Sequence, residues 1–166
     1  MDRLIKKGSA FLKEKSQDQA HEQAIRFLGI RARSRMEVER FLSQKGYAGA
    51  VIASVLNQLI GSGYISDTAF SKEWVASRLR RKPKSTMAIA WELRQKGVSE
   101  KDIEEAVSQI DEAAAAWSAV QHKLRLWRSL ESGVLKQKMI PFLKRRGFSN
   151  EVCRETVSRA LAACKP

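Results

Sequence analysis

The side chains in this sequence whose type and spacing best suit them to chemistry are the cations. Lysine and arginine number 31 against 18 aspartates and glutamates, so the 166 residues carry a formal charge of +13. Guanidinium and ammonium groups bind phosphates and carboxylates through charge-assisted hydrogen bonds. The charge therefore predicts a polyanion, a filament with acidic grooves or a membrane surface as partner. The candidate binding residues are Arg31, Arg33, Arg35, Arg78, Arg80, Arg81, Lys82, Lys84, Arg94, Lys96, Lys144, Arg145 and Arg146.

Most of these cations fall in three clusters, at residues 31–35, 78–84 and 144–146. A single basic run is explained as well by a solvated helix face as by a binding surface. Three clusters in one small basic chain favour binding. The segment 80–84 is the strongest candidate, because a loop containing Pro83 has little helical reason to carry four cations in five residues. Residues 99–116 instead contain six acidic residues and one lysine, which argues against a uniformly adhesive DNA binder.

Catalytic chemistry has little support in the sequence. His21 and His122 have no serine, cysteine or paired carboxylate at a spacing typical of a triad or a metal site. Cys153 occupies an apolar position of the helical pattern, and no glycine-rich phosphate loop of the Walker type is present. We expect a protein that is not an enzyme and that uses no metal or other cofactor.

The four tryptophans raise the alternative of base stacking, as in proteins that bind single strands. Trp74, Trp117 and Trp127 fall on apolar stripes, which favours packing in the core. Trp91 lies off the stripe of its segment, and its role stays open between the two interpretations.

Cysteine usage and the hydropathy pattern indicate a reducing compartment. Cys153 and Cys164 are too few for a disulfide framework. The first eight residues carry charge without the apolar run of a signal peptide. The longest weakly polar stretch, residues 47–60, is shorter than the roughly 20 residues that a membrane helix needs. We expect a cytoplasmic protein that neither spans nor binds a membrane.

The elements that must position the cations are helices. Beyond residue 17, apolar residues recur at intervals of three and four, and no segment shows the sustained alternation of a strand. The sequence therefore predicts an all-α protein. Left-handed residues just past helix C-termini are expected at Gly46, Gly61, Gly63, Gly97, Gly133 and Gly147.

Three of these glycines mark an internal repeat of about fifty residues. A leucine stands four residues before Gly46, Gly97 and Gly147, a cation one residue before, and an apolar residue directly after. Each repeat is interpreted as two helices around a turn, followed by a connecting helix, which is expected over residues 67–80 and 111–129 in the first two repeats. Because a helix pair cannot bury its own apolar stripe, stacked repeats must complete the core, which predicts an elongated, curved molecule. The predicted units of this single domain are residues 17–66, 67–116 and 117–166, after a basic N-terminal arm at residues 1–16.

Serines at equivalent positions support this register. Ser34 and Glu37 have the spacing of a capping box, in which each side chain bonds the backbone N–H of the other residue. Ser85 stands at the equivalent place, twelve residues before its glycine. Both serines therefore predict the start of a helix.

Three segments carry patterns that can be compared with a known family. Residues 24–38 contain Arg-x-x-Ser with a glutamate three residues on. Residues 63–70 read Gly-Tyr-Ile-Ser-Asp-Thr-Ala-Phe, and residues 92–98 read Glu-Leu-Arg-Gln-Lys-Gly-Val. In these segments the chain resembles the RecX family of recombinase regulators, and the second segment is the most specific. The resemblance covers residues 20–161.

The resemblance implies a fold of tandem three-helix repeats. It also implies binding in the helical groove of the RecA recombinase filament, suppression of ATP hydrolysis and strand exchange, and weak binding to single- and double-stranded DNA. Recombination, DNA repair and the SOS response would then be modulated. Residues 81–85, Arg-Lys-Pro-Lys-Ser, depart from the family, which often has glycine in this loop, and residues 1–16 align with no family segment.

Three functions follow as hypotheses. The first is a monomeric RecA regulator, most simply an inhibitor, that clamps neighbouring recombinase subunits. The second is a helical module that grips DNA phosphates without a recombinase and shows a steep salt dependence. The third is a helical scaffold for an acidic protein.

Overall fold

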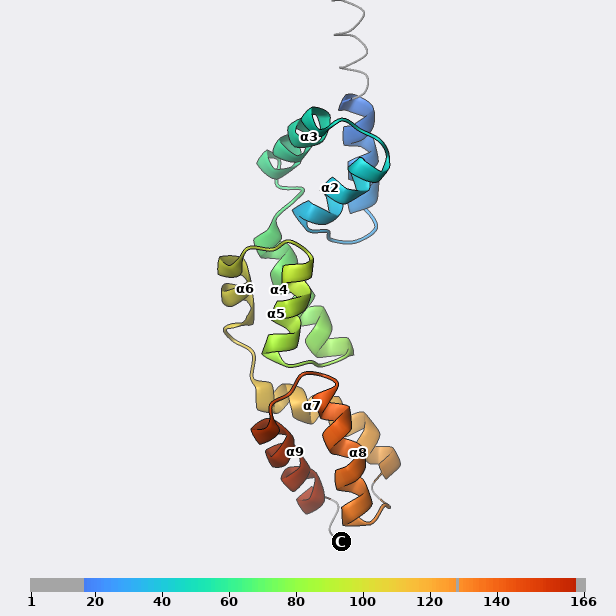
Figure 1. Ribbon diagram of the computed structural model, residues 1–166, viewed down its shortest axis with the longest axis vertical. Coiled ribbons are helices and arrows are strands. Elements are labelled where there is room, and N and C mark those ends of the chain that lie inside the picture. Colours follow the sequence, from blue (N-terminus) through green and yellow to red (C-terminus); the bar gives the residue numbers. More distant parts are fainter. Residues whose placement is uncertain (1–16, 128, 164–166) are drawn as a thin grey trace, which may run out of the picture. The chain divides into compact units, whose positions relative to one another are not determined.

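The computed structural model describes residues 17–127 and 129–163, and every regular element within these ranges is an α-helix (Figure 1). The prediction of an all-α fold is therefore confirmed. The first helix covers residues 17–28. It is followed by α2 (Arg35–Gln44), α3 (Gly49–Gly61), α4 (Asp67–Arg81), α5 (Thr86–Gln95), α6 (Glu100–Val107), α7 (Glu112–Trp127), α8 (Ser132–Lys144) and α9 (Asn150–Ala163).

The helices group into two compact units. The N-terminal unit contains the described residues up to Phe70 together with the turn Lys96–Ser99. The C-terminal unit contains Ser71–Gln95 and the described residues from Glu100 onward. The predicted basic arm at residues 1–16 lies outside the described residues.

The core of the N-terminal unit consists of one apolar stripe from each of three helices. Side chains three and four residues apart share a helix face, and burying that face stabilises the packed helices. Helix α3 supplies the longest stripe, and none of its residues is charged. The buried residues are Ala20, Ala24, Val38, Leu42, Val51, Ile52, Val55, Leu56, Leu59 and Ile65.

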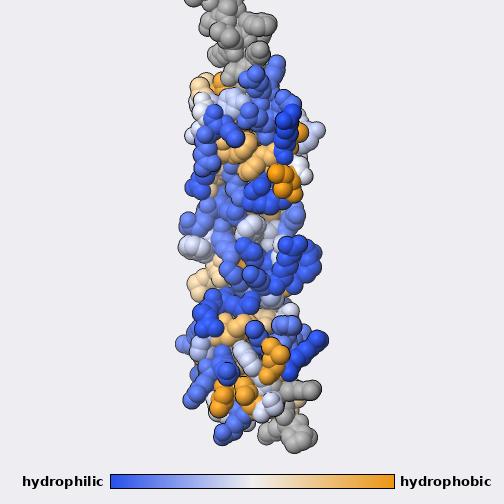
Figure 2. All heavy atoms as spheres, turned by 90° about the vertical axis from the view of Figure 1, so that its right-hand side faces the viewer, coloured by the Kyte–Doolittle hydropathy of each residue, from blue (hydrophilic) through white to orange (hydrophobic). Residues whose placement is uncertain are grey.

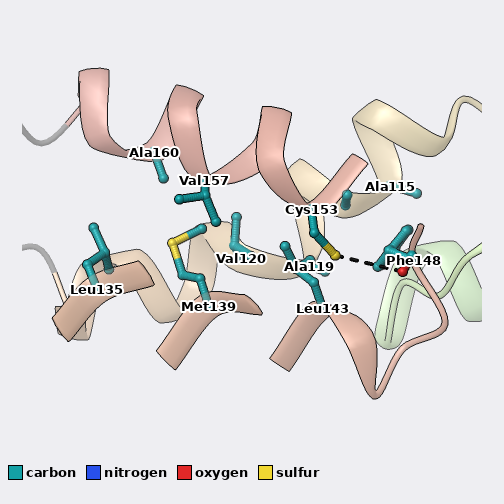
Figure 3. Close-up of a cluster of buried hydrophobic side chains, with 11 residues drawn as sticks. Ala115, Ala119, Val120, Leu135, Met139, Leu143, Phe148, Cys153, Val157 and Ala160 are labelled. Atoms are coloured by element: carbon teal, nitrogen blue, oxygen red, sulfur yellow. Dashed lines mark hydrogen bonds between the residues drawn. The ribbon is translucent and has the colours of Figure 1, made fainter. Parts of the chain in front are cut away.

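The largest core of the C-terminal unit lies between α7, α8 and α9 (Figure 3). The small residues of α7 allow the other two helices to approach closely, and Met139 and Leu143 of α8 point toward α9. Cys153 is 1 % exposed in this core, as its apolar position predicted. Its thiol donates to the backbone carbonyl of Phe148 across 3.7 Å, and burial raises the pKa of that thiol. The buried residues are Ala115, Ala116, Ala119, Val120, Leu135, Met139, Leu143, Phe148, Cys153, Val157 and Ala160.

The glycine turns follow the sequence pattern in four of six positions. Positive φ values of 74° to 87° occur at Gly46, Gly63, Gly97 and Gly147, which is the conformation that favours glycine. The prediction was wrong for the other two glycines. Gly61 is the last residue of α3, and the chain leaves the helix only at Ser62. Gly133 lies in the first turn of α8, because this helix starts at Ser132, just before the glycine.

The predicted helix starts are confirmed. The Ser34 hydroxyl accepts from the backbone N–H of Glu37 at 3.2 Å, and the Ser34 N–H donates to the Glu37 carboxylate, so the capping box is complete. Ser85 accepts from the backbone N–H of Ala88 in the same way. Both serines are buried although they cap helices, which shows that other parts of the chain cover these helix starts.

The tryptophans divide as their spacing indicated. Trp117 and Trp127 are partly buried against the core of the C-terminal unit, and Trp74 is half-buried. Trp91 is 61 % exposed. Across the described residues, no helix combines the length and the hydropathy needed to span a membrane.

Candidate functional site

The N-terminal unit holds several of the candidate cations around one carboxylate, Glu37. The Arg31 guanidinium and the Lys96 ammonium each lie 2.9 Å from Glu37 Oε1, and Arg33 lies 4.0 Å from the same atom. Lys96 is distant in sequence, but the turn before Gly97 packs on the start of α2. We call Arg31, Arg33, Glu37 and Lys96 the Glu37 cluster.

The geometry of the Glu37 cluster favours the ionised carboxylate. Burial acts to raise the pKa of Glu37, but the hydrogen bonds from Arg31, Lys96 and Ser34 outweigh burial, and the pKa lies below its usual value. The Arg33 side chain is only 14 % exposed and stacks 4.0 Å above the ring of Phe27. This arrangement holds Arg33 and Lys96 as internal structural cations, because each is covered and paired.

Arg35 is the candidate in the N-terminal unit that stays available. Its backbone N–H donates to Asp67 across 2.8 Å, whereas its side chain is exposed. The side chain lines a cavity of about 630 Å³ between α2 and α3, and it also borders a smaller hollow beside Asp67. A guanidinium in this place can bind an anionic group that enters the groove.

The C-terminal unit has an equivalent arrangement around Glu92 of α5. The carboxylate accepts from Arg78 Nε at 2.6 Å, from Trp74 Nε1 at 2.9 Å and from the ammonium of Lys84. Arg78 also stacks 4.3 Å above the Trp74 ring. Burial acts to raise the pKa of Glu92, but the three hydrogen bonds lower it further than burial raises it. We call Trp74, Arg78, Lys84 and Glu92 the Glu92 cluster.

The second and third sequence clusters meet within the C-terminal unit. Arg146 donates to the backbone carbonyl of Pro83 across 2.9 Å, and the N–H of Ser85 donates to the carbonyl of Arg146 across 3.0 Å. The Arg146 guanidinium also stacks 4.5 Å above the Phe142 ring. These contacts join the segment after α4 to the turn after α8, so two clusters about sixty residues apart in sequence form one basic region.

Five cations of this region are exposed and have no carboxylate partner among residues 17–127 and 129–163. Three lie at the end of α4 and two at the end of α8, where the partial negative charge of the helix terminus favours cations. Their charge is not neutralised locally, in contrast to that of Arg78 and Lys84. We call Arg80, Arg81, Lys82, Lys144 and Arg145 the open basic region.

Arg94 belongs to neither group. Its guanidinium makes two hydrogen bonds to the carboxylate of Glu100, at 2.6 and 2.7 Å, and both side chains are exposed. The bonds from Arg94 are the main cause that lowers the pKa of Glu100. Because water surrounds the pair, Arg94 can exchange Glu100 for another anion at small cost.

The functional residues that the sequence did not reveal are the carboxylates. Glu37 was identified as a capping residue and, like Glu92, as part of a segment that resembles the family, but neither was recognised as the partner of several cations. The signal that was available for Glu92 is its place as the single acidic residue of α5, between apolar neighbours. No sequence signal indicated that Arg146 binds Pro83.

The face of the molecule drawn in Figure 2 shows predominantly hydrophilic residues, with hydrophobic ones in scattered patches.

Profiles of one protein family match the chain three times in succession. The first three-helix domain of RecX matches residues 20–59, the second matches residues 66–107, and the third matches residues 110–157. The chain belongs to the RecX family. The tandem three-helix repeats inferred from the glycine spacing are thereby confirmed.

Individual relatives agree with this assignment. The regulatory protein RecX of Pelodictyon phaeoclathratiforme is 38 % identical over 125 residues, which cover 75 % of this chain and 78 % of the relative. The regulatory protein RecX of Mycolicibacterium smegmatis is 37 % identical over 153 residues, which cover 88 % and 81 % of the two chains. These RecX relatives are named as regulatory proteins, so the chain is assigned to a family of regulators.

Two solved RecX structures share the fold. A crystal structure of regulatory protein RecX superposes with a TM-score of 0.76 at 24 % identity, covering 89 % of this chain and 76 % of that one. The crystal structure of RecX from Lactobacillus salivarius superposes with a TM-score of 0.75 at 18 % identity, covering 90 % and 99 %. The helical architecture is therefore that of experimentally solved RecX proteins.

Proposed function

We propose that this RecX-family chain inhibits the RecA recombinase by binding the RecA filament on DNA and suppressing ATP hydrolysis and strand exchange. Homologous recombination and DNA repair are modulated as a result. The observation that carries the proposal is the open basic region, in which five exposed cations lack a carboxylate partner among the described residues. A RecA filament on DNA offers both phosphates and protein carboxylates to such cations.

The proposed mechanism is a clamp made of several weak contacts. The open basic region contacts DNA phosphates or acidic recombinase side chains, and Arg35 and Arg94 contribute further single contacts. Contacts on one chain raise the effective concentration of one another, so the combined affinity exceeds that of any single contact. A chain that contacts neighbouring RecA subunits together resists the rearrangement that each ATP turnover requires.

The protein is further proposed to act as a cytoplasmic monomer with three repeat units, residues 17–66, 67–116 and 117–166. The repeat spacing supports these units. The Glu37 cluster is not needed as a filament contact in this proposal, because its cations are already paired.

A RecA ATPase assay on single-stranded DNA tests the proposal. Addition of the purified protein at two salt concentrations is expected to lower the ATPase rate, with a weaker effect at the higher salt because exposed charges are screened. An unchanged rate at stoichiometric excess would falsify the proposal.

Measuring DNA binding beside the ATPase assay distinguishes the alternative, a DNA-binding module that acts without a recombinase. The exposed cations favour it, and it requires tight binding to DNA alone with a slope of about 0.9 in log K against log salt for each phosphate contacted on duplex DNA. Tight DNA binding without an effect on the ATPase would support this alternative, and weak binding with strong inhibition would support the RecA regulator.

A further inference from the structure

The three glycine turns of the repeats share one backbone conformation but differ in their surroundings. A Cβ atom added to Gly97 would lie 2.8 Å from the Cβ of Met36, and one added to Gly147 would lie 2.6 Å from the Ser85 hydroxyl. Met36 and Ser85 both belong to helix starts, of α2 and α5. Two of the three turns are therefore packed closely on the first residues of a helix.

The hydrogen bonds at these two contacts follow one pattern. The Ser34 hydroxyl donates to the carbonyl of Lys96 across 2.7 Å, and the Ser85 N–H donates to the carbonyl of Arg146 across 3.0 Å. In each case the carbonyl directly before the turn glycine accepts from a capping serine. The cation of the same residue then reaches an acceptor at the same helix start, which is the Glu37 carboxylate for Lys96 and the Pro83 carbonyl for Arg146.

The turn at Gly46 has the same internal structure without this partner. The Tyr47 N–H donates to the carbonyl of Leu42 across 3.3 Å, as the Phe148 N–H does to the carbonyl of Leu143. Apart from Gly46 and its two chain neighbours, no described residue comes within 4 Å of a Cβ placed at Gly46, and no described donor binds the carbonyl of Lys45. Tyr47 is only half-buried, whereas the equivalent Val98 and Phe148 are 6 % and 2 % exposed.

An apolar hollow adjoins the Gly46 turn. It has a volume of about 350 Å³ and is lined by Gln23, Arg26, Phe27, Ile30, Phe41 and Lys45. The rings of Phe27 and Phe41 stack at 4.2 Å, and Lys45 lies 5.6 Å above the Phe41 ring. Ile30 is 77 % exposed at its edge. The side-chain oxygen of Gln23 is buried beside this hollow and has no hydrogen-bond partner among the described residues.

We propose that the turn Lys45–Gly46–Tyr47 and this hollow form a docking site for the start of an α-helix in a partner protein. The partner helix carries a serine or threonine cap, whose hydroxyl donates to the Lys45 carbonyl, and an acidic residue three positions later, which binds the Lys45 ammonium. An apolar residue of its first turn fills the hollow. The occupied turn at Lys96 supplies the model for this chemistry, with the Ser34 hydroxyl on its carbonyl, Glu37 on its ammonium and Met36 of the first helical turn against Gly97.

Other occupants fit less well. A phosphodiester has no hydrogen-bond donor, so it cannot satisfy the Lys45 carbonyl or the Gln23 oxygen. A second copy of this chain has its two capping serines nearest this pattern, Ser34 and Ser85, covered by its own turns at Lys96 and Arg146. Ser66 and Ser149 also cap helices, but Ala69 and Val152 stand three positions later, so neither start offers the acidic residue. Helix α8 cannot substitute, because its N-cap residue, Glu131, makes no side-chain cap hydrogen bond.

A peptide copied from the chain's own occupied helix start tests the site. The probe is a synthetic peptide of residues 32–44 with a lactam bridge between Glu39 and a lysine placed by Ser43→Lys, since an isolated helix of this length is marginal in water. The isotopically labelled full chain is titrated with the peptide and observed by NMR. Saturable shifts are expected at Lys45, Gly46, Tyr47 and the Gln23 amide.

Matched controls decide between the outcomes. A peptide with Ser34→Ala and Glu37→Gln is expected to bind about tenfold more weakly, and Lys45→Glu in the protein is expected to weaken binding where Lys101→Glu does not. Equal binding of both peptides, shifts confined to residues 96–98, or no saturable shifts would each overturn the proposal. Binding that appears only after removal of residues 1–16 would also overturn it, because the site would then belong to the chain itself.

A second measurement, which rests on the proposed function, asks whether RecA is the partner. Lys45→Glu is expected to weaken inhibition of the RecA ATPase at least several-fold relative to Lys101→Glu. If the unaltered protein leaves the ATPase unchanged, the proposed function fails and the peptide titration still decides the docking site. If the unaltered protein inhibits and both Lys45 tests are negative, the docking site fails alone.

Discussion

The basic clusters of the two units pair cations with a central carboxylate in the same way, but they leave different numbers of cations without a carboxylate partner. In the N-terminal unit, Glu37 holds Arg31 and Lys96 at 2.9 Å and Arg33 at 4.0 Å, so Arg35 alone of the first cluster has no carboxylate partner among the described residues. In the C-terminal unit, Glu92 binds two cations, and the five of the open basic region have no carboxylate partner in the described part of the chain. A basic sequence cluster therefore keeps its charge available for a partner only where no carboxylate folds onto it.

Helix geometry explains much of this difference. Arg80 follows Arg78 by two residues, which places it about 200° around the helix and away from Glu92. Lys144 and Arg145 end α8, where cations interact favourably with the helix terminus without a carboxylate. Arg31 and Arg33 instead precede α2 and lie beside the glutamate of its first turn.

Charge reversal in the open basic region is expected to have the largest functional effect. The variant Arg80→Glu, Arg81→Glu, Lys82→Glu should lose most of its inhibition of the RecA ATPase, and the salt slope of duplex DNA binding should fall by up to about 2 to 3 units. The melting temperature should stay close to that of the unaltered protein, because these side chains are exposed and unpaired.

The matched control places the same change of charge outside both regions, with Lys101→Glu, Arg125→Glu and Arg154→Glu. These cations are also exposed. Equal loss of inhibition in the two triple variants would show that net charge, rather than the open basic region, determines binding.

Neutralising the central carboxylates is expected to change stability more than function. Glu92→Gln leaves Arg78 and Lys84 half-buried without their charged partner, which should cost about 2 to 3 kcal/mol. Glu37→Gln should cost less, about 1 to 2 kcal/mol, because glutamine can still complete the capping box with Ser34. Thermal unfolding of both variants measures the difference, and a larger loss for Glu37→Gln would contradict the comparison.

The sequence predicted the helices and turns better than the charge distribution. Apolar spacing and the fifty-residue glycine period depend on local geometry, and they located the helices, the capping box at Ser34 and the turns at Gly97 and Gly147 correctly. Whether Lys96 and Arg146 are free depends on residues far away in sequence. Lys96 meets Glu37 across 59 positions, and Arg146 meets Pro83 across 63. No local pattern encodes those contacts, so the predicted site mixed structural cations with available ones.

The two carboxylates should also make stability depend on pH. Their pKa values are lowered in the folded protein, so each contributes stability that is fully present above its unfolded pKa, near 4.5, and is lost as the pH falls through the folded value. The melting temperature should therefore fall as the pH is lowered below about 4.5. Glu92→Gln should flatten this dependence. An equally steep fall in the variant would show that other carboxylates cause it.

The smallest expected effect concerns Arg94, which shares a feature with each region. Arg94 has a carboxylate partner, like the cations of the Glu37 and Glu92 clusters. Its pair with Glu100 is exposed to solvent, like the cations of the open basic region. Glu100→Gln should leave the melting temperature unchanged, since solvent-exposed ion pairs contribute little to stability. Freeing Arg94 and removing one negative charge should strengthen DNA binding slightly at low salt and not at high salt. A measurable loss of stability would mean that exposure alone does not separate structural cations from available ones, and that the number of carboxylates near each cation decides instead.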